Sequence, residues 1–183
     1  MDKQYHPTEI EEKWAKIWSE RKVKNESSTE SFSQVIPPPN VTGTLHMGHS
    51  FQYAIMDFYT RYNHMAGKDS YWQVGSDHAG IATQMVVENN LAKKDITRKD
   101  LGREKFLEEV WSWKNYSEEK ITSQIKRLGN TVDWNKYRFT LDDDFNEAVI
   151  KAFVELHRKG KIYRGYRLVN WDPSLKTAVS DLE

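Results

Sequence analysis

The chain has 183 residues, and its 27 basic and 27 acidic side chains give a formal net charge of zero at pH 7. This balance argues against a protein held on nucleic acid mainly by its overall charge, although it is compatible with a local basic patch. The chain contains no cysteine, which excludes a disulfide framework and thiolate zinc sites.

The low apolar content suggests a piece of a larger protein. Hydrophobic residues make up 38% of the chain and the mean hydropathy is −0.82, which is low for a domain with a complete core. The last residues, 180–183, supply no cap, turn or polar tail. The polar segment 1–12 lacks the apolar core of a signal peptide, and no run approaches the roughly 20 apolar residues of a membrane span. We therefore expect a cytoplasmic protein that continues beyond this chain.

The first expected element is an amphipathic helix. Residues Thr8–Glu11 match the capping-box pattern, in which a hydroxyl and a later acidic side chain satisfy free N–H groups at a helix start. Apolar residues follow at helical spacing, namely Ile10, Trp14, Ile17 and Trp18. These features predict a helix over 8–21 and a polar, serine-rich loop over 24–33. We assign residues 1–30 to an N-terminal helix and linker.

A proline-rich loop between a strand and a helix comes next. The apolar run 32–36 predicts a buried strand, and the periodic segment 51–65 predicts a helix that ends near Gly67. The intervening segment 37–49 begins with three prolines, which cannot continue a strand ladder, so the backbone must turn there. A strand, a tight loop and a helix start form a common phosphate site, because free N–H groups and the helix dipole attract anions.

Four residues of this loop suit an anion site. Gly43 and Gly48 allow the main chain to come close to a ligand. His46 and His49 are three residues apart, so they lie near one face of the first helical turn and can both donate hydrogen bonds. Each feature is common by itself, and the prediction depends on their combination.

A second strand–loop–helix unit follows the first. Segment 70–74 predicts a strand, 75–80 a glycine-bounded polar loop and 81–91 a helix. Two such units in succession predict an α/β fold with a parallel sheet and crossover helices. Loops at the carboxyl ends of adjacent parallel strands lie side by side. The residues expected to meet there are Asn40, His46, His49, Asp77 and His78.

The pattern is helical over 95–128, with Thr97 or Asp100 as N-cap and Gly129 at the end. Trp111 and Trp113 in this stretch are expected to pack in a core or between domains. Segment 131–140 is then interpreted as a loop.

Three consecutive acidic residues, 142–144, precede a helix that ends near Gly160. They favour a cap that complements the helix dipole over a metal site. Partial alternation over 162–171 predicts a strand that Asp172 and Pro173 stop.

Several segments match one protein family. Residues 37–49 read Pro-Pro-Pro-Asn-Val-Thr-Gly-Thr-Leu-His-Met-Gly-His, and 75–84 read Gly-Ser-Asp-His-Ala-Gly-Ile-Ala-Thr-Gln. The first resembles the HIGH signature of the class I aminoacyl-tRNA synthetases, and both together resemble the valine-specific branch of that family. Segments 101–111, 168–173 and 178–183 are also similar to that branch. The resemblance covers nearly the whole chain.

The resemblance implies both a fold and an activity. Residues 31–183 would form the first half of a Rossmann-like catalytic domain with helical insertions, incomplete by itself and ending at or near the start of an editing insertion. In the implied reaction the carboxylate of valine attacks the α-phosphorus of ATP, which is bound with Mg²⁺, and yields valyl-adenylate and pyrophosphate. The valyl group then passes to tRNA(Val), and the protein is expected to be monomeric.

The resemblance also implies roles for individual residues. His46 and His49 would contact the triphosphate as catalytic groups, and Gly48 would let adenine lie against the helix. The residues expected to bind ATP are Thr42, Gly43, Thr44, His46, Gly48 and His49. Those expected to bind valine are Pro37 as an apolar wall, Asn40 as a carbonyl acceptor and Asp77 as the partner of the ammonium, with His78 behind them. Capping or packing remains an alternative for Thr42 and Thr44, and a helix cap remains one for Asp77.

Family features are also missing from these 183 residues. No Lys-Met-Ser-Lys-Ser loop occurs, and the editing and anticodon-binding parts would follow Glu183. Relatives carry zinc-binding cysteines near Asn170 and Trp171, where this chain has Asp172, so no zinc is expected and no residue is assigned as a metal ligand. One alternative is an inactive fragment that binds ATP or the tRNA acceptor end; another is a small nucleotidyltransferase with the same His-x-Gly-His loop. The candidate surface for tRNA comprises Arg158, Lys159, Lys161, Arg164 and Arg167.

Overall fold

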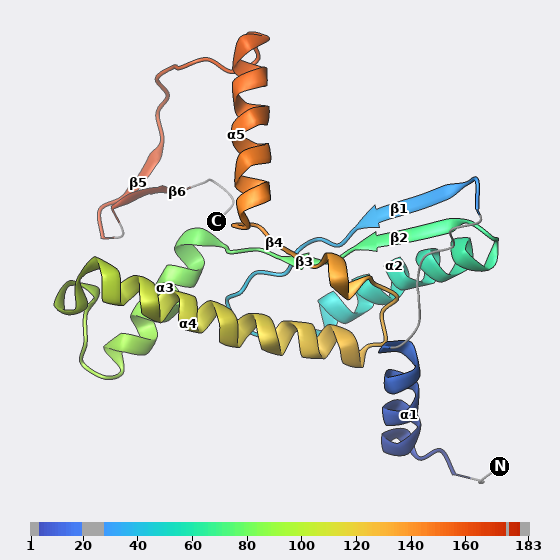
Figure 1. The fold of residues 1–183 in the computed structure, drawn as a ribbon. Helices are drawn as coiled ribbons and strands as arrows, with labels where there is room; N and C mark the ends of the chain where they lie inside the picture. Colours follow the sequence, from blue (N-terminus) through green and yellow to red (C-terminus); the bar gives the residue numbers. More distant parts are fainter. Residues whose placement is uncertain (1–3, 20–27, 175, 180–183) are drawn as a thin grey trace. The chain divides into compact units, whose positions relative to one another are not determined.

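The computed structural model describes residues 4–19, 28–174 and 176–179 (Figure 1). The chain divides into two compact units, Met1–Asp142 and Asp143–Glu183. The first unit contains α1 (Pro7–Ser19), β1 (Ser31–Val35), α2 (Met47–Met65), β2 (Asp69–Gln73), β3 (Gly75–Ser76), α3 (Gly80–Ala92), α4 (Arg98–Arg127), the 3₁₀ turn η1 (Trp134–Lys136) and β4 (Arg138–Phe139). The second contains α5 (Asp143–Arg158), β5 (Asn170–Asp172) and β6 (Thr177–Val179).

The predicted parallel pairing and crossover helix are confirmed in the first unit. β1 pairs with β2 in parallel, from Ser31 opposite Asp69 to Val35 opposite Gln73, and α2 connects and contacts both strands (Figure 1). β3 pairs with β4 in parallel, and an isolated parallel bridge joins Asn40 to Asp77. The two polar loops predicted to be neighbours are therefore joined through their backbones.

The core of the first unit lies where these loops meet α2 and α4. Its buried members are Ile36, Val41, Tyr53, Trp72, Val74, Ile121, Ile125, Val132 and Phe139. The rings of Tyr53 and Trp72 meet edge to face with centroids 6.4 Å apart, a favoured geometry for aromatic pairs. The core thus includes both ends of the segment 36–41, where the chain leaves β1.

The expected N-terminal helix exists, but Thr8 does not cap it. α1 begins at Pro7, one residue earlier, so Thr8 lies inside the first turn. Proline is favoured at a first helical position because its missing N–H would have no helical partner there. The part of the prediction that covers residues 20–27 lies outside the described residues. The boundary between residues 30 and 31 remains a prediction.

The interpretation of 131–140 as a loop was wrong. This stretch contains η1 and β4, and hydrogen bonds to β3 and the residue before it run from Arg138 N to Val74 O and, just after β4, from Thr140 N to Ser76 O. A two-residue strand is too short to show alternation in the sequence. β4 lies so close to β3 that a Cβ at Gly75 would stand 2.4 Å from Arg138 O.

In α4, Thr97 is the N-cap and forms a reciprocal capping box with Asp100, which selects between the two predicted caps. Gly102 interrupts the helix with φ 75°, a conformation that glycine adopts readily. Trp111 is half exposed rather than a core residue, although its ring still meets Phe139 at 6.2 Å.

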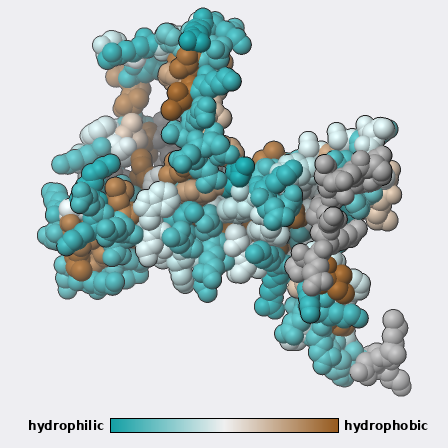
Figure 2. All heavy atoms as spheres, in the orientation of Figure 1, coloured by the Kyte–Doolittle hydropathy of each residue, from teal (hydrophilic) through white to brown (hydrophobic). Residues whose placement is uncertain are grey.

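The second unit departs further from expectation. The predicted strand over 162–171 was wrong for most of its length, because β5 begins at Asn170 and pairs antiparallel with β6. α5 has Asp143 and Asp144 in its first turn, as the dipole argument predicts, but none of its residues is buried. Several large hydrophobic side chains of α5 are exposed, among them Val149, Ile150 and Phe153. Figure 2 colours the surface of the molecule by hydropathy. No helix in the described part of the chain is long and apolar enough to cross a membrane.

Candidate active site

Two histidines cap the N-terminus of α2. His46 is the N-cap, with extended backbone angles, and its Nδ1 accepts a hydrogen bond from Gly48 N at 3.1 Å. In return His46 N donates to Nδ1 of His49 at 3.2 Å. The two rings lie 4.0 Å apart between centroids. This is a capping box in which imidazoles replace the usual hydroxyl and carboxyl groups.

The capping bonds determine what the histidines can offer to a ligand. A ring nitrogen that accepts a hydrogen bond carries no proton, so in a neutral ring the proton is on Nε2. Burial, and then the neighbouring His46, lower the pKa of His49 below its ordinary value of 6.5, which favours the neutral ring. Each histidine therefore has its Nε2–H available as a donor, while its Nδ1 stabilises the helix start.

Side chains of α4 hold the loop that leads to these histidines. Trp113 Nε1 donates to Val41 O at 2.9 Å, Ser117 Oγ donates to Gly43 O at 2.8 Å, and Leu45 N donates to Gln124 Oε1 at 2.9 Å. Alternate residues of the loop are thus bound to one helix. The sequence analysis did not predict these three hydrogen bonds, because the loop and the α4 residues that they join are more than 70 residues apart in sequence. The available signal was the polar Ser117 and Gln124 within the apolar stripe of α4.

The second loop is attached directly to the first. Asp77 N donates to Pro39 O at 2.9 Å, and Val41 N donates to Asp77 O at 3.0 Å. The Oδ1 atom of Asp77 accepts from Ala79 N and from Thr140 Oγ1, both at 3.1 Å, and lies 3.3 Å from His78 Nδ1. About a third of this side chain is exposed. The carboxylate therefore caps its own loop at one oxygen while it remains open to solvent.

The predicted site residues form two clusters linked by the loop 41–45. One cluster holds Asn40, Asp77 and His78, and the other holds His46, Gly48 and His49. The remaining members lie on the connecting chain, where Pro37 and Thr44 are exposed and Thr42 and Gly43 are partly buried. A Cβ at Gly48 would lie 2.9 Å from the ring of His46, whereas one at Gly43 would meet open space. Gly48 therefore has a steric role in the histidine pair that Gly43 lacks.

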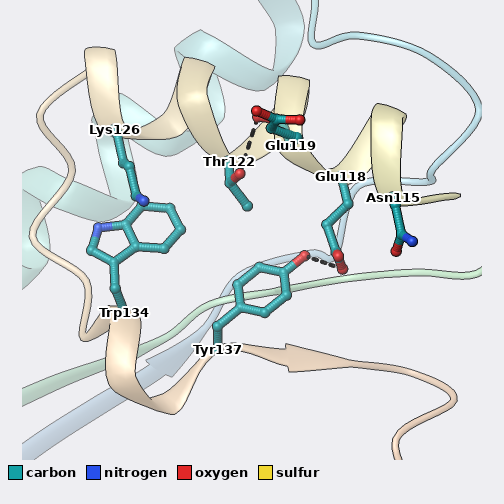
Figure 3. Close-up of a pocket in the computed structure, with 7 residues that line it drawn as sticks. All are labelled: Asn115, Glu118, Glu119, Thr122, Lys126, Trp134 and Tyr137. Atoms are coloured by element: carbon teal, nitrogen blue, oxygen red, sulfur yellow. Dashed lines mark hydrogen bonds between the residues drawn. The ribbon is translucent and has the colours of Figure 1, made fainter.

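A shallow groove of about 390 Å³ lies elsewhere, between α4 and η1 (Figure 3). Its lining residues are Asn115, Glu118, Glu119, Thr122, Lys126, Trp134 and Tyr137. Glu118 accepts from Tyr137 OH at 2.9 Å and from Ser76 Oγ at 3.1 Å, and it pairs with Lys114 at 2.7 Å. Burial raises the pKa of Tyr137 above its ordinary range, so it remains a donor. This lining shares no residue with the predicted site.

The fold and the comparisons define the class of protein. A parallel strand pair joined by a crossover helix, with a polar loop at the carboxyl end of each strand, defines a Rossmann-like α/β protein. The chain matches the family described as tRNA synthetases class I (I, L, M and V) over residues 9–183, and it belongs to that family.

Two curated relatives and one solved structure make the relation more specific. The chain is 60% identical over 180 residues to the Valine–tRNA ligase of Acinetobacter baylyi ADP1, covering 98% of this chain and 18% of the relative. It is 53% identical over 186 residues to the Valine–tRNA ligase of Francisella tularensis SCHU S4, covering 100% of this chain and 20% of the relative. It also resembles the LeuRS of Agrobacterium radiobacter K84, crystallised in a ternary complex with tRNA and LeuAMS. That likeness has a TM-score of 0.75 at 24% identity and covers 97% of this chain and 21% of the other, so it bears on the fold alone. The chain thus spans about a fifth of the length of these relatives.

Proposed function

We propose that this chain is the N-terminal part of the catalytic domain of a valine–tRNA ligase. The complete protein would activate valine with ATP and then esterify tRNA(Val). The observation that carries the proposal is the 60% and 53% identity to two Valine–tRNA ligases across essentially the whole chain. Residues 1–30 would precede the domain, and the editing insertion would begin near residue 183.

The ATP half of the site is proposed to be the histidine-capped start of α2. The carboxylate oxygen of valine attacks the α-phosphorus, the bond to the bridging oxygen breaks, and pyrophosphate leaves with that electron pair. Such transfer depends mostly on positioning and charge stabilisation. The Nε2–H groups of His46 and His49 would supply two donors for the phosphates. Thr42, Gly43 and Thr44 complete the loop, and Gly48 leaves the first turn open for adenine.

Mg²⁺ is proposed to arrive as part of the MgATP substrate. Among the described residues, no group of three or more His, Asp or Glu side chains is placed to hold a metal ion. The protein residues would accordingly bind the phosphates, while the ion is held by phosphate oxygens.

The valine half is proposed to centre on Asp77. Its carboxylate would pair with the substrate ammonium, a charge-assisted contact that gains strength where water is excluded. Asn40, bridged to Asp77, would offer a carbonyl acceptor, and the exposed ring of Pro37 would form part of the wall against the isopropyl group. His78 would support the carboxylate from behind.

The other parts of the proposal concern the whole protein. A lysine-bearing loop that grips the phosphates would come from outside this chain. The exposed basic residues Arg158, Lys159, Lys161, Arg164 and Arg167 are candidates for contacts with tRNA phosphates. The protein is proposed to act in the cytoplasm as a monomer.

Valine-dependent exchange of labelled pyrophosphate into ATP tests the proposal, with the complete protein measured beside the 183-residue chain. We expect His49→Ala to weaken exchange by about a hundredfold, as for a lost transition-state donor, and Asp77→Ala nearly to abolish it. His157→Ala is the matched control, since His157 is exposed on α5. Equal exchange with threonine, isoleucine or no amino acid would refute the assignment of the valine pocket.

Exchange by the complete protein alone would mean that the chain by itself is a binding fragment. If neither the complete protein nor the 183-residue chain catalyses exchange but ATP still binds, the alternative of an inactive ATP-binding fragment would be favoured over a ligase. The small nucleotidyltransferase alternative has no support from the relatives found, because the two curated ones described above are both Valine–tRNA ligases.

A further inference from the structure

The hydroxyl group of Thr140 contacts three polar atoms of the loop that carries Asp77. Thr140 directly follows β4, and its N–H donates to Ser76 O at 3.2 Å, which fixes it beside the end of β3. Its Oγ1 accepts from His78 N at 2.9 Å and lies 2.6 Å from His78 Nδ1 and 3.1 Å from Asp77 Oδ1. One side chain from a neighbouring strand thus meets backbone, imidazole and carboxylate together.

The hydrogens and lone pairs available at Thr140, Asp77 and His78 indicate which atom donates in each contact. A threonine hydroxyl has one hydrogen to donate and two lone pairs to accept with. Asp77 Oδ1 can only accept when ionised, so the Thr140 hydrogen points to it. Both lone pairs then accept, from His78 N and from a proton on His78 Nδ1. In this arrangement the Thr140 hydroxyl uses its hydrogen and both lone pairs, and Nε2 of His78 is left as an acceptor.

The loop needs such support because its backbone is unusual. Ala79 has φ 49°, a left-handed conformation that costs a residue with a Cβ of order 1 kcal/mol. It persists where surrounding contacts over-determine it, and here Ala79 N donates to Asp77 Oδ1 while Thr83 Oγ1 donates to His78 O at 2.6 Å. Among the described contacts, Thr140 adds the only side-chain hydrogen bonds to this loop from β4 and its end, beside the edge contact of the Phe139 ring with His78 at 6.4 Å, so it helps to fix the loop relative to the sheet.

We propose that Thr140 is a positioning residue that orients the carboxylate of Asp77 and the ring of His78 for recognition of the substrate ammonium. The role in valine binding rests on the proposed function. The hydrogen-bond assignment does not, because it is argued from the contacts of Thr140 with Asp77 and His78 and from the ionised state of Asp77.

The first test is the protonation of His78 in the 183-residue chain labelled with ¹⁵N-histidine. Native protein and Thr140→Ser should show His78 with its proton on Nδ1, and Thr140→Val should lose that pattern. Thr122→Val is the matched control, since the Thr122 hydroxyl bonds only to Glu119 O within its own helix among described contacts. A native His78 protonated on Nε2, or a pattern unchanged in Thr140→Val, would overturn the assignment.

The second test is pyrophosphate exchange by the complete protein. Loss of a hydrogen bond to a charged group predicts a KM for valine raised about tenfold in Thr140→Val, with the KM for ATP within about twofold of native. Thr140→Ser should restore the valine KM to within about threefold. A rise in both KM values together, or failure of the serine variant to restore, would refute a positioning role. If native protein shows no valine-dependent exchange, the proposed function fails and the His78 measurement alone decides whether Thr140 orients the loop.

Discussion

Gly75 allows β4 to approach β3, and replacing it with alanine should separate the two strands. A Cβ at this position would stand 2.4 Å from the carbonyl oxygen of Arg138. This oxygen belongs to the main chain, so a change of side-chain rotamer cannot relieve the clash. Ordinary contact begins at 3.4 Å, so β4 must retreat by about 1 Å. The bonds Arg138 N to Val74 O and Thr140 N to Ser76 O, already 3.2 Å long, would then exceed hydrogen-bond distance.

The loss of unfolding free energy in Gly75→Ala can be estimated from these contacts. Two backbone hydrogen bonds contribute about 1 kcal/mol each, and overpacking at a rigid contact adds about 1–3 kcal/mol. Gly75→Ala should therefore lower the free energy of unfolding by about 3 kcal/mol or more. Gly43→Ala is the matched control, because its Cβ would meet open space, and it should not lower the free energy of unfolding and should raise it by at most about 1 kcal/mol.

Urea unfolding of the 183-residue chain, followed by tryptophan fluorescence, measures both variants against native protein. The midpoint should fall for Gly75→Ala with little change in the slope with urea. If Gly75→Ala loses less than about 1 kcal/mol, or no more than Gly43→Ala does, then the β3–β4 approach is not as tight as described.

Three further outcomes are expected. Ser117→Ala removes the donor to Gly43 O and should cost about 1 kcal/mol in urea unfolding, whereas Ser123→Ala, whose hydroxyl bonds to its own helix at Lys120 O, should cost little. Because folding lowers the pKa of His49, its imidazole binds a proton more readily in the unfolded chain than in the folded one. The contribution of His49 to the free energy of unfolding should therefore be complete above about pH 6.5 and lost as pH falls through the folded pKa. His49→Gln should flatten this part of the pH dependence of unfolding. Gly129→Ala would place a Cβ 2.3 Å from the ring of Trp18 at a backbone φ of 72°, so hydrogen exchange in α1 should accelerate; unchanged exchange would contradict the contact.

Local pattern predicted those parts of the fold in which neighbouring residues decide the outcome. The run 32–36, the proline turn and the periodic segment 51–65 located β1, the loop and α2, and the two strand–loop units correctly predicted that Asn40 and Asp77 meet. β4 was missed because two residues carry no periodicity, and residues 162–169 were assigned to a strand because alternation alone cannot show whether a partner strand exists. The roles of the site residues remain predictions.

The side-chain contacts that hold the two site loops, and that the sequence could not reveal, come from one stretch, residues 113–140. From α4, Trp113, Ser117 and Gln124 hold the loop that leads to the histidines, and beyond β4 Thr140 holds the loop of Asp77. Each contact spans more than 60 residues, so no local spacing rule could predict it. Because the loops are also bonded to each other between residues 39–41 and Asp77, a shift of this stretch would move both halves of the site together. Variants that loosen α4 as a whole should thus weaken the binding of both proposed substrates, whereas loss of the Thr140 hydroxyl should weaken the proposed binding of valine more than that of ATP.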